Sequence, residues 1–134
     1  MANIEANTQL ERMTSGVPKV IDAKGHAVLD YMTAGTFLAA GFALRNRNRA
    51  ASTWAFVNGL GVLGASMMTD YPGGVWKLFS FKTHRMIDVG QAAMAAAGPA
   101  LFGFAGEPEG QFFHGQAALE TGVIAMTNWG SAAR

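Results

Sequence analysis

A fifteen-residue stretch of this chain occurs twice, first from Gly16 and again from Gly74. Residues 16–30 read GVPKVIDAKGHAVLD and residues 74–88 read GVWKLFSFKTHRMID, with six of the fifteen positions identical and no gap. Self-similarity of this kind indicates that one structural unit is repeated. We therefore interpret the chain as a single domain with a tail at 1–15, repeat one at 16–73 and repeat two at 74–131.

Each repeat contains two apolar stretches that predict a pair of helices. In repeat one, residues 25–44 carry one charge, Asp30, and residues 50–69 carry none. The basic run at 45–49 separates them, which predicts an antiparallel hairpin. Twenty helical residues span ~30 Å, the thickness of the hydrocarbon core of a bilayer. By the same argument, the helices of repeat two are predicted at 84–104 and 111–129.

The composition points toward a membrane. Charged residues make up 14% of the chain, compared with about 25% in a soluble domain. The chain also has 17 glycines, and small residues allow membrane helices to approach one another closely. The fold class predicted is therefore an all-α integral membrane four-helix bundle, built from two tandem two-helix repeats with pseudo-two-fold symmetry. A soluble four-helix bundle, the alternative, would need a polar stripe on every helix, and residues 50–69 offer little of one.

The orientation follows from the basic residues. The polar N-terminus lacks the features of a signal peptide, and an even number of helices in each repeat places both chain ends on one side. That side would hold seven basic residues and the other side three: Arg12, Lys19, Lys24, Lys77, Lys82, Arg85 and Arg134 against Arg45, Arg47 and Arg49. The positive-inside rule then predicts a multi-pass protein of the bacterial inner membrane with cytoplasmic termini.

Several function classes are disfavoured by the sequence. The net charge of +1 gives no basic face for nucleic acid. The absence of cysteine excludes disulfides and cysteine-ligated metals. No glycine-rich phosphate loop, Ser-His-Asp arrangement or HExxH motif occurs. We therefore expect a protein that is not an enzyme.

The duplicated stretch contains the chain's main candidate site. His26 with Asp30, and His84 with Asp88, are each spaced i, i+4, so each pair lies on one helix face. The repeat places both pairs at the same depth. Two further polar residues end the neighbouring helices at that level, Asp70 and Asn128.

Two interpretations of these pairs remain open. In the first, they are structural: an Asp in the first turn of a helix is favoured by the helix dipole, and a His one turn earlier can donate to it. Asp70 and Asn128 would help to fasten the same end. In the second, His26 and His84 bind a cofactor, a metal, a haem or a chlorophyll-type pigment, with each Asp accepting the other ring N–H. The sequence requires no cofactor.

Glu120 is a separate candidate, because it lies inside an apolar stretch. An ionisable residue in such a position is a functional hypothesis by default. Repeat one has Val62 at the matching position, so the carboxylate is specific to repeat two. It could pack against other helices, face a partner subunit or relay protons.

Repeat two resembles the bacterial SPW-repeat family. The resemblance runs from position 98 to position 127: GPALFGF at 98–104, an acidic loop, and an apolar stretch with Glu120 and Thr127. Members of that family are small membrane proteins made of two-helix units with a Ser-Pro-Trp motif near the end of a helix. Here the motif is Gly-Pro-Ala, and Ala40-Gly41-Phe42 of repeat one has no proline. The resemblance implies a four-helix membrane protein and no activity.

Three functions are compatible with these observations. The first is a non-catalytic subunit of a larger membrane complex, of respiratory or photosynthetic type, in contact with lipid and other subunits. The second is a metal-, haem- or pigment-binding protein that uses His26 and His84. The third is a homo-oligomeric transporter that uses Glu120.

Overall fold

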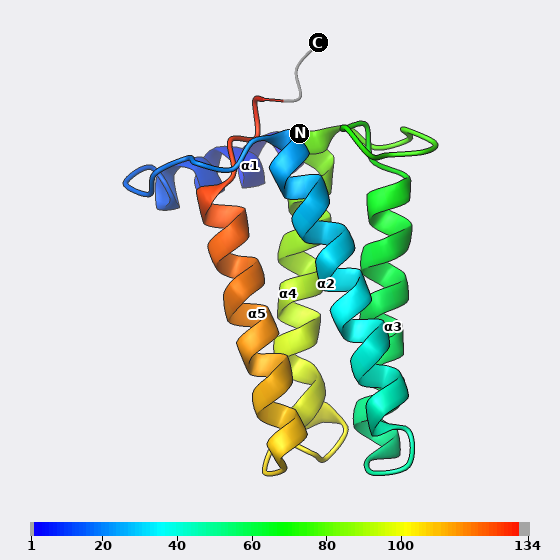
Figure 1. The fold of residues 1–134 in the computed structure, drawn as a ribbon. Coiled ribbons are helices and arrows are strands. Elements are labelled where there is room, and N and C mark those ends of the chain that lie inside the picture. Colours follow the sequence, from blue (N-terminus) through cyan, green and yellow to red (C-terminus); the bar gives the residue numbers. More distant parts are fainter. Residues whose placement is uncertain (1, 132–134) are drawn as a thin grey trace.

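The computed structural model describes residues 2–131, and the chain there is helical. Four long helices form a bundle in which each runs antiparallel to the next along the chain, and a shorter helix lies across one end (Figure 1). The helices are α1 (Ala2–Met13), α2 (Ala23–Leu44), α3 (Arg49–Met67), α4 (Phe81–Leu101) and α5 (Pro108–Met126). The described part of the chain has no strands, only two isolated bridges.

The long helices begin where polar side chains satisfy their first backbone N–H groups. Asp22, Asn48 and Ser80 precede α2, α3 and α4, and each accepts a hydrogen bond from the backbone N–H three residues later. Such caps supply partners that the first turn of a helix otherwise lacks. A proline in the first turn begins α5 instead, where its missing N–H is not needed.

The predicted integral membrane four-helix bundle is wrong, although the described chain is all-α. Among the described helices, only α2 is both long enough and apolar enough to cross a membrane, with a mean hydropathy of 1.4 over its best window. One such helix is weak evidence, because a core helix of a soluble protein meets the same criteria. The other long helices are rich in alanine, glycine and polar residues, and α4 and α5 also carry charges within their spans. Length and scarcity of charge led to the prediction, but glycine and polar residues lower the mean hydropathy of these helices.

The two hairpins, α2 with α3 and α4 with α5, are joined by reciprocal backbone contacts. The segment before α2 binds the end of α5, since Ile21 N donates to Met126 O (3.1 Å) and Asn128 N donates to Ile21 O (2.7 Å). Another such pair joins the segment before α4 to the end of α3: Phe79 N to Met68 O (2.9 Å) and Asp70 N to Phe79 O (2.7 Å). The two pairs of contacts use matching positions of the two repeats, so these contacts follow the duplication.

Small residues let α2 and α3 pack closely. A Cβ added at Gly41 would lie 2.9 Å from the Phe56 ring, and one added at Gly59 would lie 2.9 Å from Leu38. Both distances are too short for real contacts, so the two glycines are needed for this packing. Two aromatic clusters fill the core of the bundle, one at each end. They are Tyr71, Phe81 and Trp129 with small and aliphatic residues, and Phe37, Phe104 and Phe113 with alanines.

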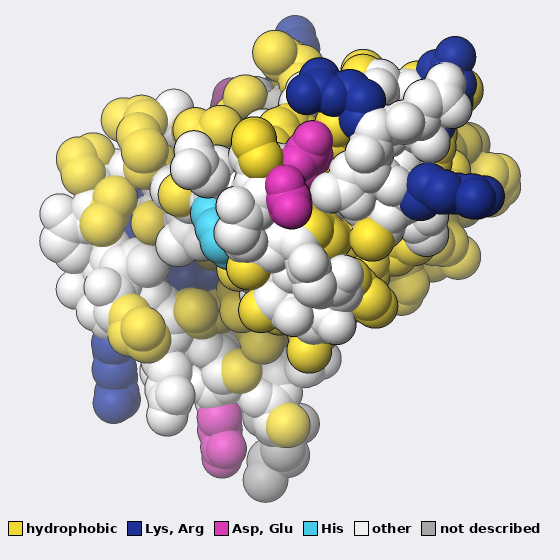
Figure 2. Space-filling view, turned by 90° about the horizontal axis from the view of Figure 1, so that it is seen from below, with side chains coloured by type: hydrophobic (Ala, Val, Ile, Leu, Met, Phe, Trp, Pro, Cys, Tyr) yellow, Lys and Arg dark blue, Asp and Glu magenta, His cyan; other side chains and the backbone are white. Residues whose placement is uncertain are grey.

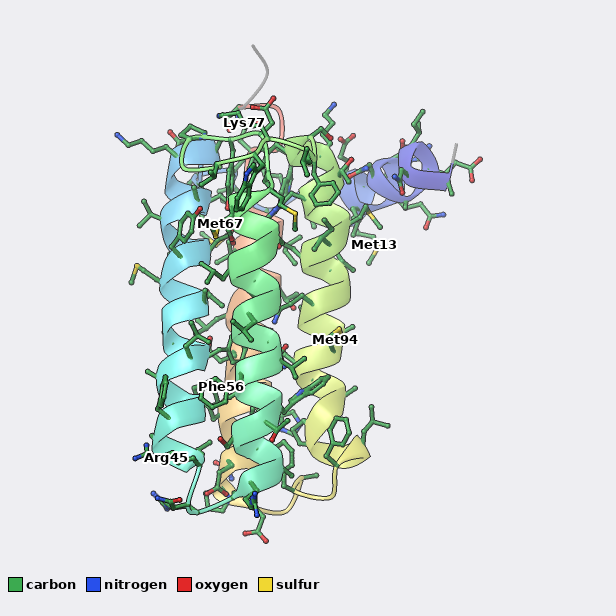
Figure 3. All side chains as sticks on the ribbon, turned by 90° about the vertical axis from the view of Figure 1, so that its right-hand side faces the viewer. Met13, Arg45, Phe56, Met67, Lys77 and Met94 are labelled. Atoms are coloured by element: carbon green, nitrogen blue, oxygen red, sulfur yellow. The ribbon has the colours of Figure 1, made fainter. Side chains whose placement is uncertain are left out.

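The N-terminal tail forms α1 beside the start of α4. It extends to one side at the end of the bundle that holds Lys77, opposite the end that holds Arg45 (Figure 3). Glu11 of α1 lies 3.8 Å from Arg85, which is only 2% exposed and lies over the Trp129 ring. The α1 helix therefore helps to cover a buried arginine at the end of the bundle where the candidate site lies.

Candidate functional site

His26, Asp30, His84 and Asp88 meet in one cluster, the His/Asp centre, between α2 and α4. The Nε2 atom of His26 lies 3.3 Å from Asp30 and 2.9 Å from Asp88. The Nε2 atom of His84 lies 3.0 Å from each of the same two carboxylates. One ligand atom from each of the four side chains can be chosen so that all lie within 4.8 Å of one another. The i, i+4 pairs therefore touch, and each also touches the pair of the other repeat.

Two threonine hydroxyls determine which ring nitrogens face the centre. Thr127 Oγ1 lies 2.9 Å from His26 Nδ1, and Thr69 Oγ1 lies 2.7 Å from His84 Nδ1. Each hydroxyl donates its one hydrogen to the carbonyl four residues earlier in its own helix, at 2.6 Å. It must therefore accept a hydrogen bond from the imidazole, so Nδ1 carries a proton in both rings. This leaves both Nε2 atoms directed at the two carboxylates.

The centre is shielded from solvent. His26 and His84 are 0% and 1% exposed, and Asp30 is 8% exposed. The rings of Tyr71, Phe81 and Trp129 pack around the two imidazoles. Such enclosure lowers the local dielectric, which strengthens every charge interaction in the cluster.

The two halves of the centre differ in one contact. Tyr71 donates its hydroxyl to Asp30 Oδ2 at 2.8 Å. The matching residue in repeat two is Trp129, whose ring N–H donates to a backbone carbonyl instead, that of Ile124 at 3.0 Å. Asp30 therefore has a partner that Asp88 lacks, and Asp88 is the more exposed carboxylate of the two.

The pKa values of the groups in the centre are set by two opposing effects, burial and the nearby charges. Burial lowers the pKa of His84, but its contacts with Asp30 and Asp88 outweigh this effect and raise the pKa to about 9. The pKa of His26 is raised by the same balance. Burial raises the pKa of Asp30, but the two imidazoles outweigh it and hold the pKa at about 2. Protons bound to the imidazoles thus compensate the two carboxylates.

The same four groups form a suitable ligand set for one divalent ion. Two neutral imidazole nitrogens and two carboxylates would balance a charge of +2, and no cysteine is present to favour a soft metal. Ligands at ~2.0–2.2 Å from a tetrahedral ion are separated by roughly 3.4 Å. The imidazole–carboxylate contacts of 2.9–3.3 Å use a different oxygen of each carboxylate for each ring, and one ligand atom per side chain can be chosen so that all four lie within 4.8 Å of one another. Small side-chain movements would therefore bring the four groups to a tetrahedral spacing. His84 Nε2 also makes no well-aligned hydrogen bond to any described group, although a carboxylate lies 3.0 Å away on either side. An ion lying between these groups, in place of the Nε2 proton, would give that nitrogen a partner.

A haem or chlorophyll-type pigment suits this geometry less well. A carboxylate oxygen of the other repeat lies 2.9 Å from Nε2 of His26 and 3.0 Å from Nε2 of His84. Each Nε2 atom therefore faces a carboxylate and not an open space that could hold a macrocycle. A macrocycle would have to separate these contacts and displace the surrounding aromatic rings.

The other predicted residues lie outside the centre. The Asp70 carboxylate lies 3.6 Å from Lys77 Nζ at the surface, and the Asn128 side chain accepts a hydrogen bond from Gly130 N. Their backbone N–H groups make the reciprocal contacts between the hairpins. Glu120 lies on α5 and lines a pocket next to the centre.

The roles of three residues at the site were not predicted from the sequence: Thr69, Thr127 and Tyr71. A signal for the threonines was present, because they are identical residues at matching positions of the two repeats. Nothing in the sequence shows that each threonine binds the histidine of the other hairpin's helix. For Tyr71 there was no such signal, because its counterpart is Trp129.

No family model, curated protein or solved structure matches this chain. The resemblance to the SPW-repeat family therefore stays a prediction, and the site is interpreted from its own chemistry.

Proposed function

We propose that this chain is a metal-binding protein that holds one divalent first-row transition-metal ion at the His/Asp centre. The observation that supports this most strongly is the pair of threonine contacts. Because Thr69 and Thr127 take up the Nδ1 protons, both imidazoles direct Nε2 toward the same two carboxylates. Ligating histidines in metal sites are oriented in this way, by a hydrogen bond at the other ring nitrogen.

The ligand set favours Zn²⁺ or a neighbouring ion such as Fe²⁺, Mn²⁺ or Ni²⁺ over Ca²⁺ and Mg²⁺. Calcium and magnesium prefer oxygen ligands, whereas imidazole suits the transition metals. Four protein ligands would complete a tetrahedral site. That coordination is typical of zinc in a structural role, where the bound ion stabilises the fold.

A structural lock without a metal is the competing interpretation, since the four side chains also satisfy one another when both imidazoles are protonated. The two interpretations predict different results for metal titration. Protein stripped of metal should bind about one Zn²⁺ per chain in competition with a chromophoric chelator, and its melting temperature should rise with the Zn²⁺ concentration.

Two variants make this titration decisive. His84→Gln removes one ligand and should abolish stoichiometric binding, whereas His114→Gln, which changes an exposed histidine on α5, should bind as the wild type does. If wild-type protein binds no Zn²⁺, or if His84→Gln binds it equally well, the metal-binding function is excluded and the structural lock remains.

A second candidate function, the accessory subunit of a larger complex, is favoured by the surface. Each long helix exposes large hydrophobic side chains: Val28, Met32 and Phe42 on α2, Val57 and Leu60 on α3, Met94 and Leu101 on α4, and Leu119 on α5. Seen from the end with the α2–α3 and α4–α5 loops, hydrophobic side chains cover much of the surface, and basic and acidic side chains lie among them near the loops (Figure 2). Exposed apolar surface of this extent is typical of proteins that contact other proteins or lipid.

Native electrophoresis of the mildly extracted protein tests this second candidate. Migration with other subunits supports it, and migration as a lone monomer excludes it. Fractionation of the source cells tests the predicted bacterial inner-membrane location in the same preparation: recovery after alkaline carbonate washing supports that location, and release by the wash contradicts it.

A further inference from the structure

A pocket of about 220 Å³ opens between α2 and α5, next to the His/Asp centre. Its walls are mostly apolar and include Met32, Val62, Leu119 and Val123. Sites for drug-sized ligands occupy ~300–1,000 Å³, so a ligand of this pocket would be small.

The residues that wall this pocket differ from their counterparts in the other repeat. Large side chains at Met32 and Leu119 wall it, whereas their counterparts in the other repeat are Gly90 and Gly61, which have no side chain to form a wall. Glu120 likewise lines the pocket from α5, and its counterpart is Val62. The large side chains that wall the pocket, and the Glu120 carboxylate in it, therefore lie at positions where the two repeats differ.

Three carboxylates line the pocket, and none of its described lining residues is basic. Two of them, Asp30 and Asp88, belong to the His/Asp centre, where the imidazoles or a metal ion compensate their charge. Glu120 has no such compensation. Both of its carboxyl oxygens are shielded from solvent and accept no well-formed hydrogen bond from the described residues.

The nearest amide is already engaged. Gln91 Nε2 donates to Asn58 Oδ1 at 3.0 Å, although Gln91 lies close enough to Glu120 to favour its charged form to some extent. Burial nevertheless raises the pKa of Glu120 to about 7. An ionised carboxylate in an apolar wall is costly without a cation or donors beside it.

We propose that this pocket binds a small ligand made of a protonated primary amine on a short apolar body, and that the Glu120 side chain turns into the pocket to accept hydrogen bonds from the amine. An ammonium group supplies the positive charge and the N–H donors that the carboxylate lacks. The amide oxygen of Gln116, also in the lining, could accept another of its hydrogens. The apolar body would contact Met32, Leu119 and Val123. An anion would be repelled by Glu120, and a neutral ligand would leave its charge uncompensated.

This proposal does not depend on the metal, because the His/Asp centre is charge-balanced with or without one. Calorimetric titration with n-hexylamine, using 1-hexanol as the uncharged analogue, tests it on metal-free and Zn²⁺-treated protein. We expect one saturable amine site in both preparations and much weaker binding of the alcohol. Glu120→Gln should weaken amine binding about tenfold or more, because charge-assisted hydrogen bonds are lost. It should leave the Zn²⁺ stoichiometry unchanged.

Two further variants provide controls. Glu107→Gln changes an exposed carboxylate that makes no capping hydrogen bond, and it should bind the amine as the wild type does. Thr36→Phe places bulk in the pocket from an exposed position and should block the amine while the helical circular dichroism is retained. Equal affinity for amine and alcohol, unchanged binding by Glu120→Gln, or no binding to the wild type would each overturn the proposal. A loss of Zn²⁺ binding alone would concern the His/Asp centre and not the pocket.

Discussion

The two repeats are almost equivalent around the His/Asp centre and differ beside it. Each contributes one His, one Asp and one Thr, and their contacts match within a few tenths of an ångström. A few side chains away, Tyr71 corresponds to Trp129, and Val62 corresponds to Glu120. The shared part therefore holds the two hairpins together through one polar centre, whereas the divergent part forms a pocket on one side. The following predictions test where the equivalence ends.

The largest effect is expected from removal of a central carboxylate. Asp30→Asn should lower the free energy of unfolding by about 3 kcal/mol, because it leaves buried imidazoles without a compensating charge. Asp88→Asn should cost less, because Asp88 is more exposed and lacks the hydrogen bond that Tyr71 gives to Asp30. Urea unfolding of both variants measures the difference, and equal losses would show that the Tyr71 contact contributes nothing.

Replacing Glu120 should stabilise the protein at alkaline pH. Burial raises the pKa of Glu120 from 4.5 to about 7, so the folded state binds this proton more tightly than the unfolded chain does. The resulting stabilisation is complete below pH 4.5 and is lost as the pH rises through 7. The free energy of unfolding of Glu120→Gln should therefore exceed that of the wild type by about 2 kcal/mol at pH 8. The two free energies should be equal at pH 4. A pH-independent difference would mean that Glu120 is not buried in this way.

The two threonines should behave alike. Thr69→Val and Thr127→Val each leave one buried Nδ1–H without an acceptor, at a cost of about 1–2 kcal/mol. Each should also weaken Zn²⁺ binding about 10- to 100-fold, because a metal-oriented imidazole loses its partner. Chelator competition on both variants measures this, and a large effect of one threonine alone would contradict the equivalence of the two halves.

The smallest effect is expected at Asp70. Its ion pair with Lys77 is exposed on both sides, and such pairs contribute about 0–1 kcal/mol. Asp70→Asn should retain full Zn²⁺ binding, which makes it the control for Asp30→Asn and Asp88→Asn. Loss of the metal in this variant would extend the site beyond the four side chains of the centre.

Much of the site could be predicted from the sequence, because its spacing has a direct geometrical meaning. The i, i+4 spacing places His26 beside Asp30, and the duplication places His84 and Asp88 at the same level. The contacts of Thr69 and Thr127 with the two histidines could not be predicted from the sequence. They depend on how the end of each hairpin packs against the first helix of the other hairpin. Asp70 and Asn128 were expected near the centre, and they contribute backbone N–H groups to the contacts between the hairpins.

The fold was predictable in its helices and not in its relation to a membrane. The four apolar stretches predicted α2 to α5 within a few residues, whereas α1 and the side-chain caps of α2, α3 and α4 were not anticipated. The membrane bundle was inferred from length and scarcity of charge. Glycine and uncharged polar residues satisfy both criteria without making a helix strongly apolar, so among the helices of residues 2–131 only α2 meets the hydropathy expected of a membrane span.

Titration with Co²⁺, followed by visible absorption, tests most directly whether both repeats contribute to one ion site. Co²⁺ substitutes for Zn²⁺, and a tetrahedral site gives it far more intense absorption bands than water does. We predict intense bands that saturate at one Co²⁺ per chain and disappear in both His26→Gln and His84→Gln. Saturation at two ions, bands that survive loss of either histidine, or no tetrahedral absorption would contradict a single centre shared by the two repeats.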